Sequence, residues 1–355
     1  MMERIYNIED ASDILPMWVA DMDFKAPPKV LDAIQERIEQ GVLGYSYVCE
    51  GCKQSIVSWF ETRHKWIIDS STILFHHGVI PIIATVIETF TKPGDQVGMM
   101  TPVYPPFFNL PTNQKRQITQ VTLYEEDGKY RIDYEMLEQT FKDGVKLFIL
   151  CNPHNPGGIV WTKEDLQRIV DLAIQYNVLI LSDEIHADIL MKGHAYTPLL
   201  TLPNASKAKI ITAIAPTKTF NLAGIHAAMM VVPNDDLRTT LEQNAMAHGH
   251  TELNVFASAA LQAAYTYGAP WLDELLQYIE INMDYCTQEL NTIPGIRVRK
   301  PGGTYLLWID YRGTGLTEEK IMNQHLHTGK LALEPGTKYG EAGRGFLRMN
   351  VACPF

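Results

Sequence analysis

One pattern limits the possible folds of this chain most strongly: a short apolar run, an amphipathic helix and a second short apolar run. The first run is Val145–Leu150 (VKLFIL) and the second is Val178–Leu181 (VLIL). Between them, Thr162 is suited to cap a helix with Asp165 at its third position, and Asn177 ends the helical pattern. The apolar face of this helix contains Leu166, Ile169, Val170, Ala173 and Ile174. A strand–helix–strand unit of this kind predicts a parallel sheet with helices on both faces.

Further short apolar runs extend the same alternation. They occur at Gln96–Met100, Ile210–Ile214 and Ala228–Val232. Together with the first two runs they predict an α/β fold. Its large domain, residues 36–270, would hold a mostly parallel sheet between helices.

The pattern changes after residue 270. A helical stretch extends from about Trp271 to Leu290, and the segments Ile296–Arg299 and Thr304–Asp310 flank a Pro-Gly-Gly turn that is typical of a hairpin. This change predicts a second, smaller α+β domain, made of residues 271–355 together with residues 1–35.

Charge and composition exclude several classes of function. The 355 residues include 30 Lys and Arg against 41 Asp and Glu, a formal net charge of −11. This argues against a nucleic-acid partner, because phosphate binding needs a positive surface. No apolar run approaches the ~18–20 residues that span a bilayer, and the first residues, MMERIYNIEDASD, lack the apolar core of a signal peptide. We therefore expect a cytoplasmic globular protein without a membrane partner.

The cysteines indicate a reducing compartment rather than a disulfide framework. There are five, an odd number, and they are spread along the chain. Cys49 and Cys52 form a CxxC pair, but no second CxxC and no nearby His pair at ligand spacing accompanies it. We expect no metal site.

Side chains with useful chemistry follow the predicted strands, at the edge where open parallel sheets bind ligands. They are Tyr104, Asn155, Asp183 and Lys218. Residues 78–80 precede a helix expected to begin near Pro81, whose free N–H groups suit an anion. A lysine, a carboxylate, an amide and an aromatic ring around an anion site are what pyridoxal phosphate (PLP) requires. The amine binds its aldehyde and the carboxylate pairs with its ring nitrogen.

Six ordered segments resemble those of one enzyme family. They are LPMWVADMDF (Leu15–Phe24), PVYPPF (Pro102–Phe107), CNPHNPGG (Cys151–Gly158), SDEIHADI (Ser182–Ile189), APTKTFNLAG (Ala215–Gly224) and LRMNVACP (Leu347–Pro354). As a set they resemble the class I/II aminotransferases of PLP fold type I. Within that family they are most similar to the cystathionine β-lyase branch, also called cysteine-S-conjugate β-lyases or maltose-regulon modulators. The resemblance implies PLP as the cofactor.

The resemblance assigns roles around the cofactor ring. Lys218 would be the Schiff-base lysine and the proton shuttle, and Asp183 the partner of the ring nitrogen. Asn155 would donate to the phenolic oxygen, and Tyr104 would stack on the ring. His186 stands where many aminotransferases have a tyrosine that bonds the phenolic oxygen.

Phosphate and substrate contacts follow from the same resemblance. Val79, Ile80 and Thr217 would bind the phosphate within one subunit. Tyr45, with Tyr47 as the alternative, would reach the phosphate of the neighbouring subunit, which implies a homodimer with shared active sites. The substrate, a small-molecule amino acid, would contact Arg348, Asn155 and Ala20, with Arg348 holding its α-carboxylate.

Two further departures from the family pattern are visible. His226 stands where many aminotransferases carry a phosphate-binding arginine, so the remaining N–H and hydroxyl donors must compensate. Family members usually continue through a terminal helix beyond the arginine motif. We therefore expect such a helix to be missing after Phe355.

These observations favour a PLP-dependent carbon–sulfur β-lyase that cleaves cystathionine or related cysteine S-conjugates to pyruvate, ammonia and a thiol. The alternative is an aminotransferase on the same scaffold, since both reactions begin with loss of the Cα proton. A third hypothesis is a regulatory protein that acts through protein contacts. The complete set of catalytic residues argues against a purely non-catalytic role.

Overall fold

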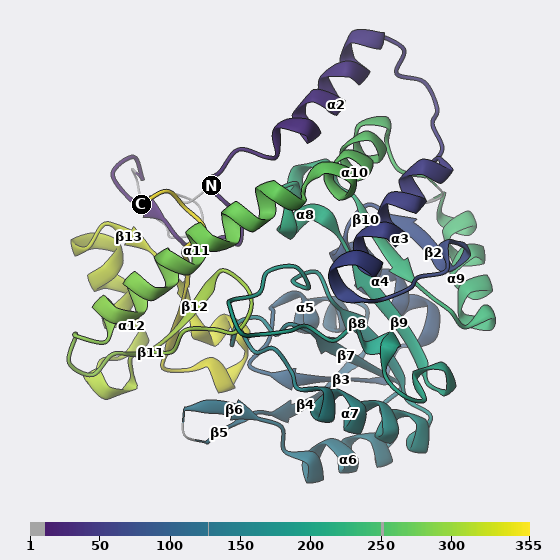
Figure 1. The fold of residues 1–355 in the computed structure, drawn as a ribbon. Coiled ribbons are helices and arrows are strands. Elements are labelled where there is room, and N and C mark those ends of the chain that lie inside the picture. The colour runs from purple at the N-terminus through teal and green to yellow at the C-terminus, as the bar shows by residue number, and fades with distance from the viewer. Residues whose placement is uncertain (1–10, 127, 250–251) are drawn as a thin grey trace.

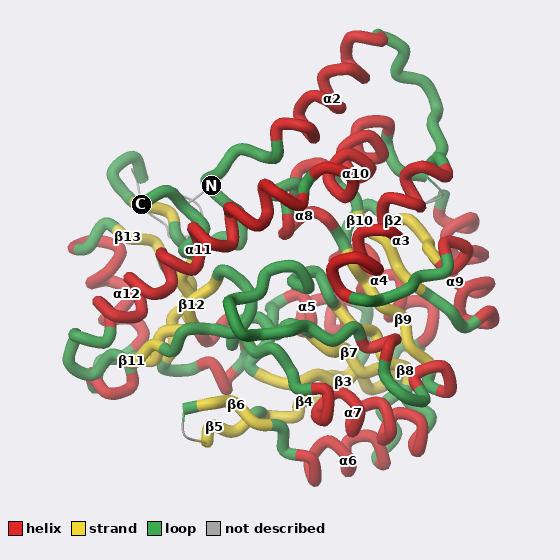
Figure 2. Tube along the Cα trace, in the orientation of Figure 1, coloured by secondary structure: helices red, strands yellow, loops and turns green. Residues whose placement is uncertain are grey.

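A seven-stranded sheet forms the centre of the computed structural model, which describes residues 11–126, 128–249 and 252–355 (Figure 1 and Figure 2). The first ten residues of the predicted segment 1–35 thus lie outside the described residues. The strand order is β2 (Ile73–His76), β10 (Ala228–Val231), β9 (Lys209–Ile214), β8 (Leu179–Asp183), β7 (Leu147–Cys151), β3 (Gln96–Thr101) and β4 (Gln117–Thr122). β9, β8, β7, β3 and β4 run parallel, whereas β10 is antiparallel to both its neighbours. The predicted α/β class with a mostly parallel sheet is confirmed.

The strand–helix–strand unit of the sequence is present as predicted. β7 and β8 are adjacent and parallel, and α7 (Lys163–Tyr176) connects them. Thr162 and Asp165 form a capping box in which each side chain accepts a hydrogen bond from the other's backbone N–H, at 3.1 and 3.3 Å. Asn177 ends the helix in the left-handed conformation, with φ 54° and ψ 42°.

Helices cover both faces of the large sheet. One face packs against α4 (Val79–Phe90), α5 (Pro106–Asn113) and α9 (Asp235–His248). The other face packs against α6 (Tyr134–Lys142) and α7, and nearer β9, β10 and β2 against α3 (Glu50–His64) and α10 (Val255–Tyr267). The sequence predicted a helix start near Pro81, and α4 begins two residues earlier, at Val79. A proline fits the first turn because the N–H groups there have no partner within the helix.

A smaller antiparallel sheet follows the long helix α11 (Ala269–Leu290), which Figure 1 shows running from α10 toward this sheet. Its strands lie in the order β11 (Arg297–Val298), β12 (Leu306–Asp310), β15 (Phe346–Asn350) and β14 (Glu334–Pro335). β11 and β12 are the predicted hairpin. The N-terminal strand β1 (Leu15–Pro16) pairs in parallel with β13 (Leu331–Ala332). The first described residues therefore pack against the last part of the chain.

The remaining elements lie around these two sheets. They are the hairpin strands β5 (Tyr124–Glu126) and β6 (Lys129–Arg131), and the helices α2 (Pro28–Gln40), α8 (Pro216–Thr219) and α12 (Glu318–Asn323). No helix within the described ranges is both long and apolar enough to cross a membrane.

An outer segment, residues 41–49, connects α2 to α3. α2 packs along α10 near one end of the molecule, and the chain then runs along the outside before it enters α3 (Figure 1). Four large apolar side chains of this segment are exposed to solvent: Val42, Leu43, Tyr45 and Tyr47. A run of exposed apolar side chains is typical of a surface that meets another protein.

Candidate active site

The carboxyl ends of four parallel strands bring the predicted ring-binding residues to one edge of the large sheet. Tyr104 follows β3, Asn155 follows β7, Asp183 ends β8, and Lys218 lies on α8 just after β9. Asn155 and Asp183 are buried, and Tyr104 is partly buried. This is the edge at which open α/β sheets bind ligands.

Asp183 is a buried carboxylate that forms no ion pair with any described residue. One of its oxygens, Oδ1, accepts a hydrogen bond from the backbone N–H of Ile185 at 3.2 Å. Burial raises the pKa of Asp183 to about 7, although the Ile185 hydrogen bond and the positive charge of Lys218 act in the opposite direction. A cationic partner would therefore stabilise the ionised form of this carboxylate.

Lys218 lies near Asp183 with its amine in a mostly buried position. Its Nζ donates to the carbonyl oxygen of Ala20 at 2.5 Å and lies 3.8 Å from Asp21 Oδ1. Burial lowers the pKa of the Lys218 amine, partly offset by the negative charge of Asp21. A lysine with a lowered pKa has a larger fraction of neutral, nucleophilic amine at neutral pH.

A second buried carboxylate, Asp188, holds the turn that carries Lys218. It accepts hydrogen bonds from Thr219 Oγ1 at 2.8 Å and from Trp59 Nε1 at 3.0 Å, and its Oδ1 lies 2.6 Å from His64 Nε2. Burial alone would raise the pKa of Asp188, but the hydrogen bond and charge of His64 bring it below its ordinary value. Asp188 thus ties α3 to the residue next to Lys218.

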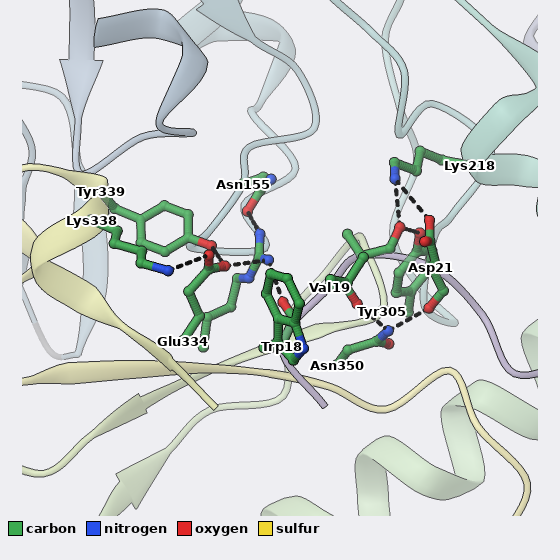
Figure 3. A network of polar contacts seen from close by, with 12 residues as sticks. Trp18, Val19, Asp21, Asn155, Lys218, Tyr305, Glu334, Lys338, Tyr339 and Asn350 are labelled. Carbon is green, nitrogen blue, oxygen red and sulfur yellow. Dashed lines mark hydrogen bonds and ion pairs between the residues drawn. The ribbon is translucent and has the colours of Figure 1, made fainter. Parts of the chain in front are cut away.

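Arg348, on β15, extends toward the same edge from the smaller sheet. Its side chain is buried, and its Nη1 donates to Asn155 Oδ1 at 3.2 Å. Its Nη2 donates to Glu334 Oε2 at 2.6 Å and to the carbonyl oxygen of Trp18 at 2.7 Å. Figure 3 shows the N-terminal segment that carries Trp18, Val19 and Asp21 lying between the Glu334 cluster and Lys218.

The residues predicted to bind phosphate lie at helix starts near this edge. Val79 and Ile80 are the first two residues of α4, whose first-turn N–H groups lack intrahelical partners. Val79 belongs to the same buried cluster against which Tyr104 packs. Thr217 is buried and directly precedes Lys218. Such N–H groups favour an anion.

The predicted contact from the neighbouring subunit, and the position of the missing arginine, lie away from this cluster within one chain. Tyr45 lies in the outer segment and its side chain is fully exposed, as is most of Tyr47. His226 is exposed and follows a short helical turn, where it adopts φ 59°. Ala20 does reach the cluster, but its carbonyl oxygen accepts hydrogen bonds from Lys218 and from Tyr305 Oη.

Four residues of the cluster were not singled out from the sequence. Glu334 and Tyr339 contact each other beside Arg348. Asp21 lies beside Lys218, and Tyr305 donates to the carbonyl oxygen that accepts from Lys218. Asp21 lies within a segment used for the family resemblance, so that segment could have pointed to it. The other three depend on tertiary contacts that no local pattern indicates.

No metal site accompanies this cluster among the described residues, where no group of three or more His, Cys, Asp or Glu side chains is arranged to hold an ion. All five cysteines, which lie in the described part of the chain, are free thiols. Burial raises the pKa of Cys52 to about 12, which keeps this member of the CxxC pair protonated and unreactive.

Comparison with known proteins identifies the family. The model for aminotransferase class I and II matches residues 12–354. The chain belongs to this family. It is 42% identical to cystathionine beta-lyase PatB of Bacillus subtilis strain 168 over 344 residues, which cover 96% of this chain and 89% of that relative.

Two solved structures have nearly the same fold as this chain. One is a PLP-bound putative aminotransferase from Clostridium difficile 630, with a TM-score of 0.96 and 41% identity over 99% of this chain and 91% of that chain. The other is cystalysin from Treponema denticola, which contains PLP. Its TM-score is 0.96, with 33% identity over 99% of this chain and 90% of that chain.

The residues at the sheet edge fit PLP, the cofactor that both of these solved structures contain. Asp183 lacks a cationic partner among the described residues, and His186 Nδ1 is buried there without a hydrogen-bond partner. Burial lowers the pKa of His186 to about 3, so the ring is neutral and can accept or donate one hydrogen bond. A protonated ring nitrogen and a polar ring substituent would satisfy groups that the protein alone leaves unpaired.

Asp183→Asn should change the pH dependence of stability in the protein stripped of PLP. Because the pKa of Asp183 rises from 3.8 unfolded to about 7 folded, its ionisation makes folding less favourable as pH rises from about 4 to 7. An amide at this position cannot ionise, so the variant should gain about 1–4 °C in Tm over the native chain at pH 8 and much less at pH 5. Calorimetry of both stripped proteins measures this. Equal Tm differences at the two pH values would contradict it.

Proposed function

We propose that this chain is a PLP-dependent carbon–sulfur β-lyase. Its substrates would be cystathionine or related cysteine S-conjugates, and its products pyruvate, ammonia and a thiol. The observation that carries this proposal is the convergence of Lys218, Asp183 and Arg348 at one sheet edge, in a chain 42% identical to a cystathionine β-lyase. The similarity covers nearly the whole chain, which includes every residue of the cluster.

The residues of the sheet edge would divide the work of holding PLP. Lys218 would bind its aldehyde, Asp183 would pair with the ring nitrogen, and Tyr104 would stack on the ring. Asn155 and His186 would contact the phenolic oxygen. When bound, PLP supplies an electron sink that stabilises negative charge at the substrate Cα.

The phosphate would lie at the helix starts described above. The first-turn N–H groups of Val79 and Ile80 and the hydroxyl of Thr217 would hold it within one subunit. His226, which stands where an arginine is common in the family, has an exposed side chain. We therefore assign the phosphate chiefly to backbone N–H groups and hydroxyls.

Lys218 is the group placed to move protons. Once the substrate amine has taken its place on the cofactor, the freed Nζ would remove the Cα proton. It would then protonate the sulfur that leaves Cβ. Its lowered pKa suits this role, because a general base works best with a pKa near the operating pH. Arg348 would hold the α-carboxylate in the orientation that this transfer needs.

Aminotransfer is the second candidate, and one observation favours it: the solved structure from Clostridium difficile is described as a putative aminotransferase. Lys218 would serve both reactions as base. In lysis the β-substituent would leave the substrate. In aminotransfer the β-substituent would stay, and Lys218 would return the proton to the cofactor and not to the substrate.

Three further features belong to the same proposal. We assign residues 36–270 to a large domain and residues 1–35 with 271–355 to a small one, supported by the pairing of β1 with β13. We propose a cytoplasmic homodimer in which Tyr45 of each subunit reaches the phosphate of the other. The exposed apolar side chains of the outer segment support this arrangement.

Borohydride reduction of the PLP-loaded protein should attach the cofactor to Lys218 and to no other lysine. Lys218 combines a buried amine with a lowered pKa, whereas every other lysine except the half-buried Lys53 is exposed. Peptide mass spectrometry of the reduced protein identifies the modified residue. A label on another lysine would refute the assignment. Lys218→Ala should lose nearly all turnover but still bind PLP non-covalently.

Cystathionine should give one pyruvate and one thiol per turnover without consuming 2-oxoglutarate. A thiolate is a good leaving group at Cβ, so its departure should be faster than reprotonation, the step that leads to aminotransfer. Alanine, which has no leaving group, should only exchange its Cα proton or transaminate slowly. Pyruvate, thiol and keto-acid consumption are measured together. Faster transamination of alanine or aspartate than lysis of cystathionine would establish the aminotransferase instead.

Mixed dimers should reveal whether Tyr45 acts across subunits. In a dimer of one Lys218→Ala and one Tyr45→Ala subunit, one site would have both native residues and the other neither. Differently tagged, purified mixed dimers should therefore recover about half of the native activity per dimer. The matched pair with Tyr47→Ala tests the alternative residue. Recovery no greater than the Tyr45→Ala homodimer would place Tyr45 in its own subunit's site or outside both.

A further inference from the structure

Arg348 already has a counter-ion within the protein. The Glu334 carboxylate lies 2.6 Å from its Nη2, and the two side chains are only 11% and 4% exposed. A buried ion pair with this separation leaves little of the guanidinium's charge uncompensated. A substrate carboxylate that approaches Arg348 therefore meets a guanidinium that is already paired with a carboxylate.

The position of Glu334 is set by the smaller sheet. Glu334 on β14 and Arg348 on β15 are direct cross-strand partners, so their side chains lie on the same face. Tyr339 Oη also donates to Glu334 Oε2, at 2.5 Å, and Lys338 Nζ lies 3.4 Å from Oε1. Figure 3 shows Lys338 and Tyr339 converging on Glu334. This carboxylate is held in place by three donors.

The guanidinium has little hydrogen-bonding capacity left for a ligand. Its Nη2 serves Glu334 and the Trp18 carbonyl, and its Nη1 donates to Asn155. Its Nε is buried and has no partner among the described residues. A carboxylate that binds two-pronged to Arg348 needs two adjacent N–H groups. The two that no described residue uses, Nε–H and one N–H of Nη1, do not lie on the same edge of the guanidinium. A two-pronged contact must therefore displace one of the present acceptors.

We propose that Glu334 is a specificity-determining residue that competes with the substrate's carboxylate for Arg348. This rests on the proposed function, in which Arg348 is the carboxylate anchor. The competition weakens the binding of every ligand that relies on its carboxylate. Amino-acid substrates offset this through the bond of their amine to the cofactor and through their side chain. Keto acids and simple carboxylates lack the amine, so the site discriminates against them.

This discrimination favours lysis over aminotransfer. An aminotransferase must bind a keto acid as its second substrate, whereas a β-lyase must release pyruvate as its product. A built-in competitor at the carboxylate anchor hinders the first step and assists the second. Glu334 would thus help to separate two reactions that share their early catalytic residues.

Glu334→Gln tests the proposal, because the amide keeps an acceptor for Arg348 and Tyr339 but removes the charge. Propionate, a carboxylate that cannot react, and pyruvate are titrated calorimetrically into the PLP-loaded proteins. Both should bind about tenfold more tightly to the variant, since an uncompensated buried arginine attracts any carboxylate. The ratio of aminotransfer from alanine to lysis of cystathionine should rise. Unchanged or weaker binding would show that Glu334 only positions Arg348, and would overturn the proposal.

Two other variants complete the test. Glu341→Gln removes an exposed carboxylate that pairs with Arg344, and should leave propionate affinity unchanged. Tyr339→Phe keeps the ring beside Arg348 but removes the hydroxyl that shares Glu334, so it should weaken propionate binding. This opposite shift is decisive if Glu334→Gln does not fold, and its absence would then overturn the proposal. Arg348→Gln separates the assumptions: if propionate binds it normally, the anchor assignment itself fails.

Discussion

The buried positive charge of Arg348 joins three parts of the chain that are distant in sequence. Its guanidinium contacts the carbonyl of Trp18 near the N-terminus, Asn155 beyond the large sheet and Glu334 within the small sheet. A buried cation without partners would be very costly, so these contacts must form together. The surroundings of Arg348 are therefore complete only when the small sheet and the N-terminal segment have docked against the large sheet.

Burial drives Asp183 and Lys218, the two groups proposed to bind the cofactor ring, toward their neutral forms. It raises the pKa of Asp183 and lowers the pKa of Lys218, although each charge opposes the shift of the other. The low polarity of the sheet edge thus disfavours both charges in the protein alone. A cofactor that brings a cationic ring nitrogen to Asp183 and consumes the amine of Lys218 relieves both costs. The charges that PLP would bring are thus the ones that this buried sheet edge lacks.

Local signals predicted the large sheet well because its strands and helices are specified by short-range patterns. The apolar runs predicted β3, β7, β8, β9 and β10, and the Thr162–Asp165 capping box predicted the start of α7. The antiparallel direction of β10 was not predicted, since the apolar pattern of a buried strand is the same in either direction. α4 begins two residues before the proline that marked its predicted start, because a proline fits at any position of the first turn.

The sequence could predict a residue of the candidate site only where a reactive side chain follows a predicted strand or lies in a segment that resembles the family. Glu334 follows neither rule, since it reaches Arg348 through the register of β14 against β15. Register depends on the packing of the whole small sheet and not on neighbouring residues. Tyr305 and Tyr339 were also missed. A buried tyrosine in a turn carries no local sign of its hydrogen-bond partner.

The network around Asp188 links the turn that carries Lys218 to the helix that follows the exposed outer segment. Asp188 lies five residues after Asp183 and bonds Thr219, the neighbour of Lys218. The same carboxylate receives Trp59 and His64 from α3, and α3 begins directly after the exposed segment 41–49. The helix that follows this exposed segment therefore supplies two of the groups that hold Asp188 beside Lys218. In the proposed dimer, α3 would thus connect the segment that meets the partner to the carboxylate that positions the residue next to Lys218.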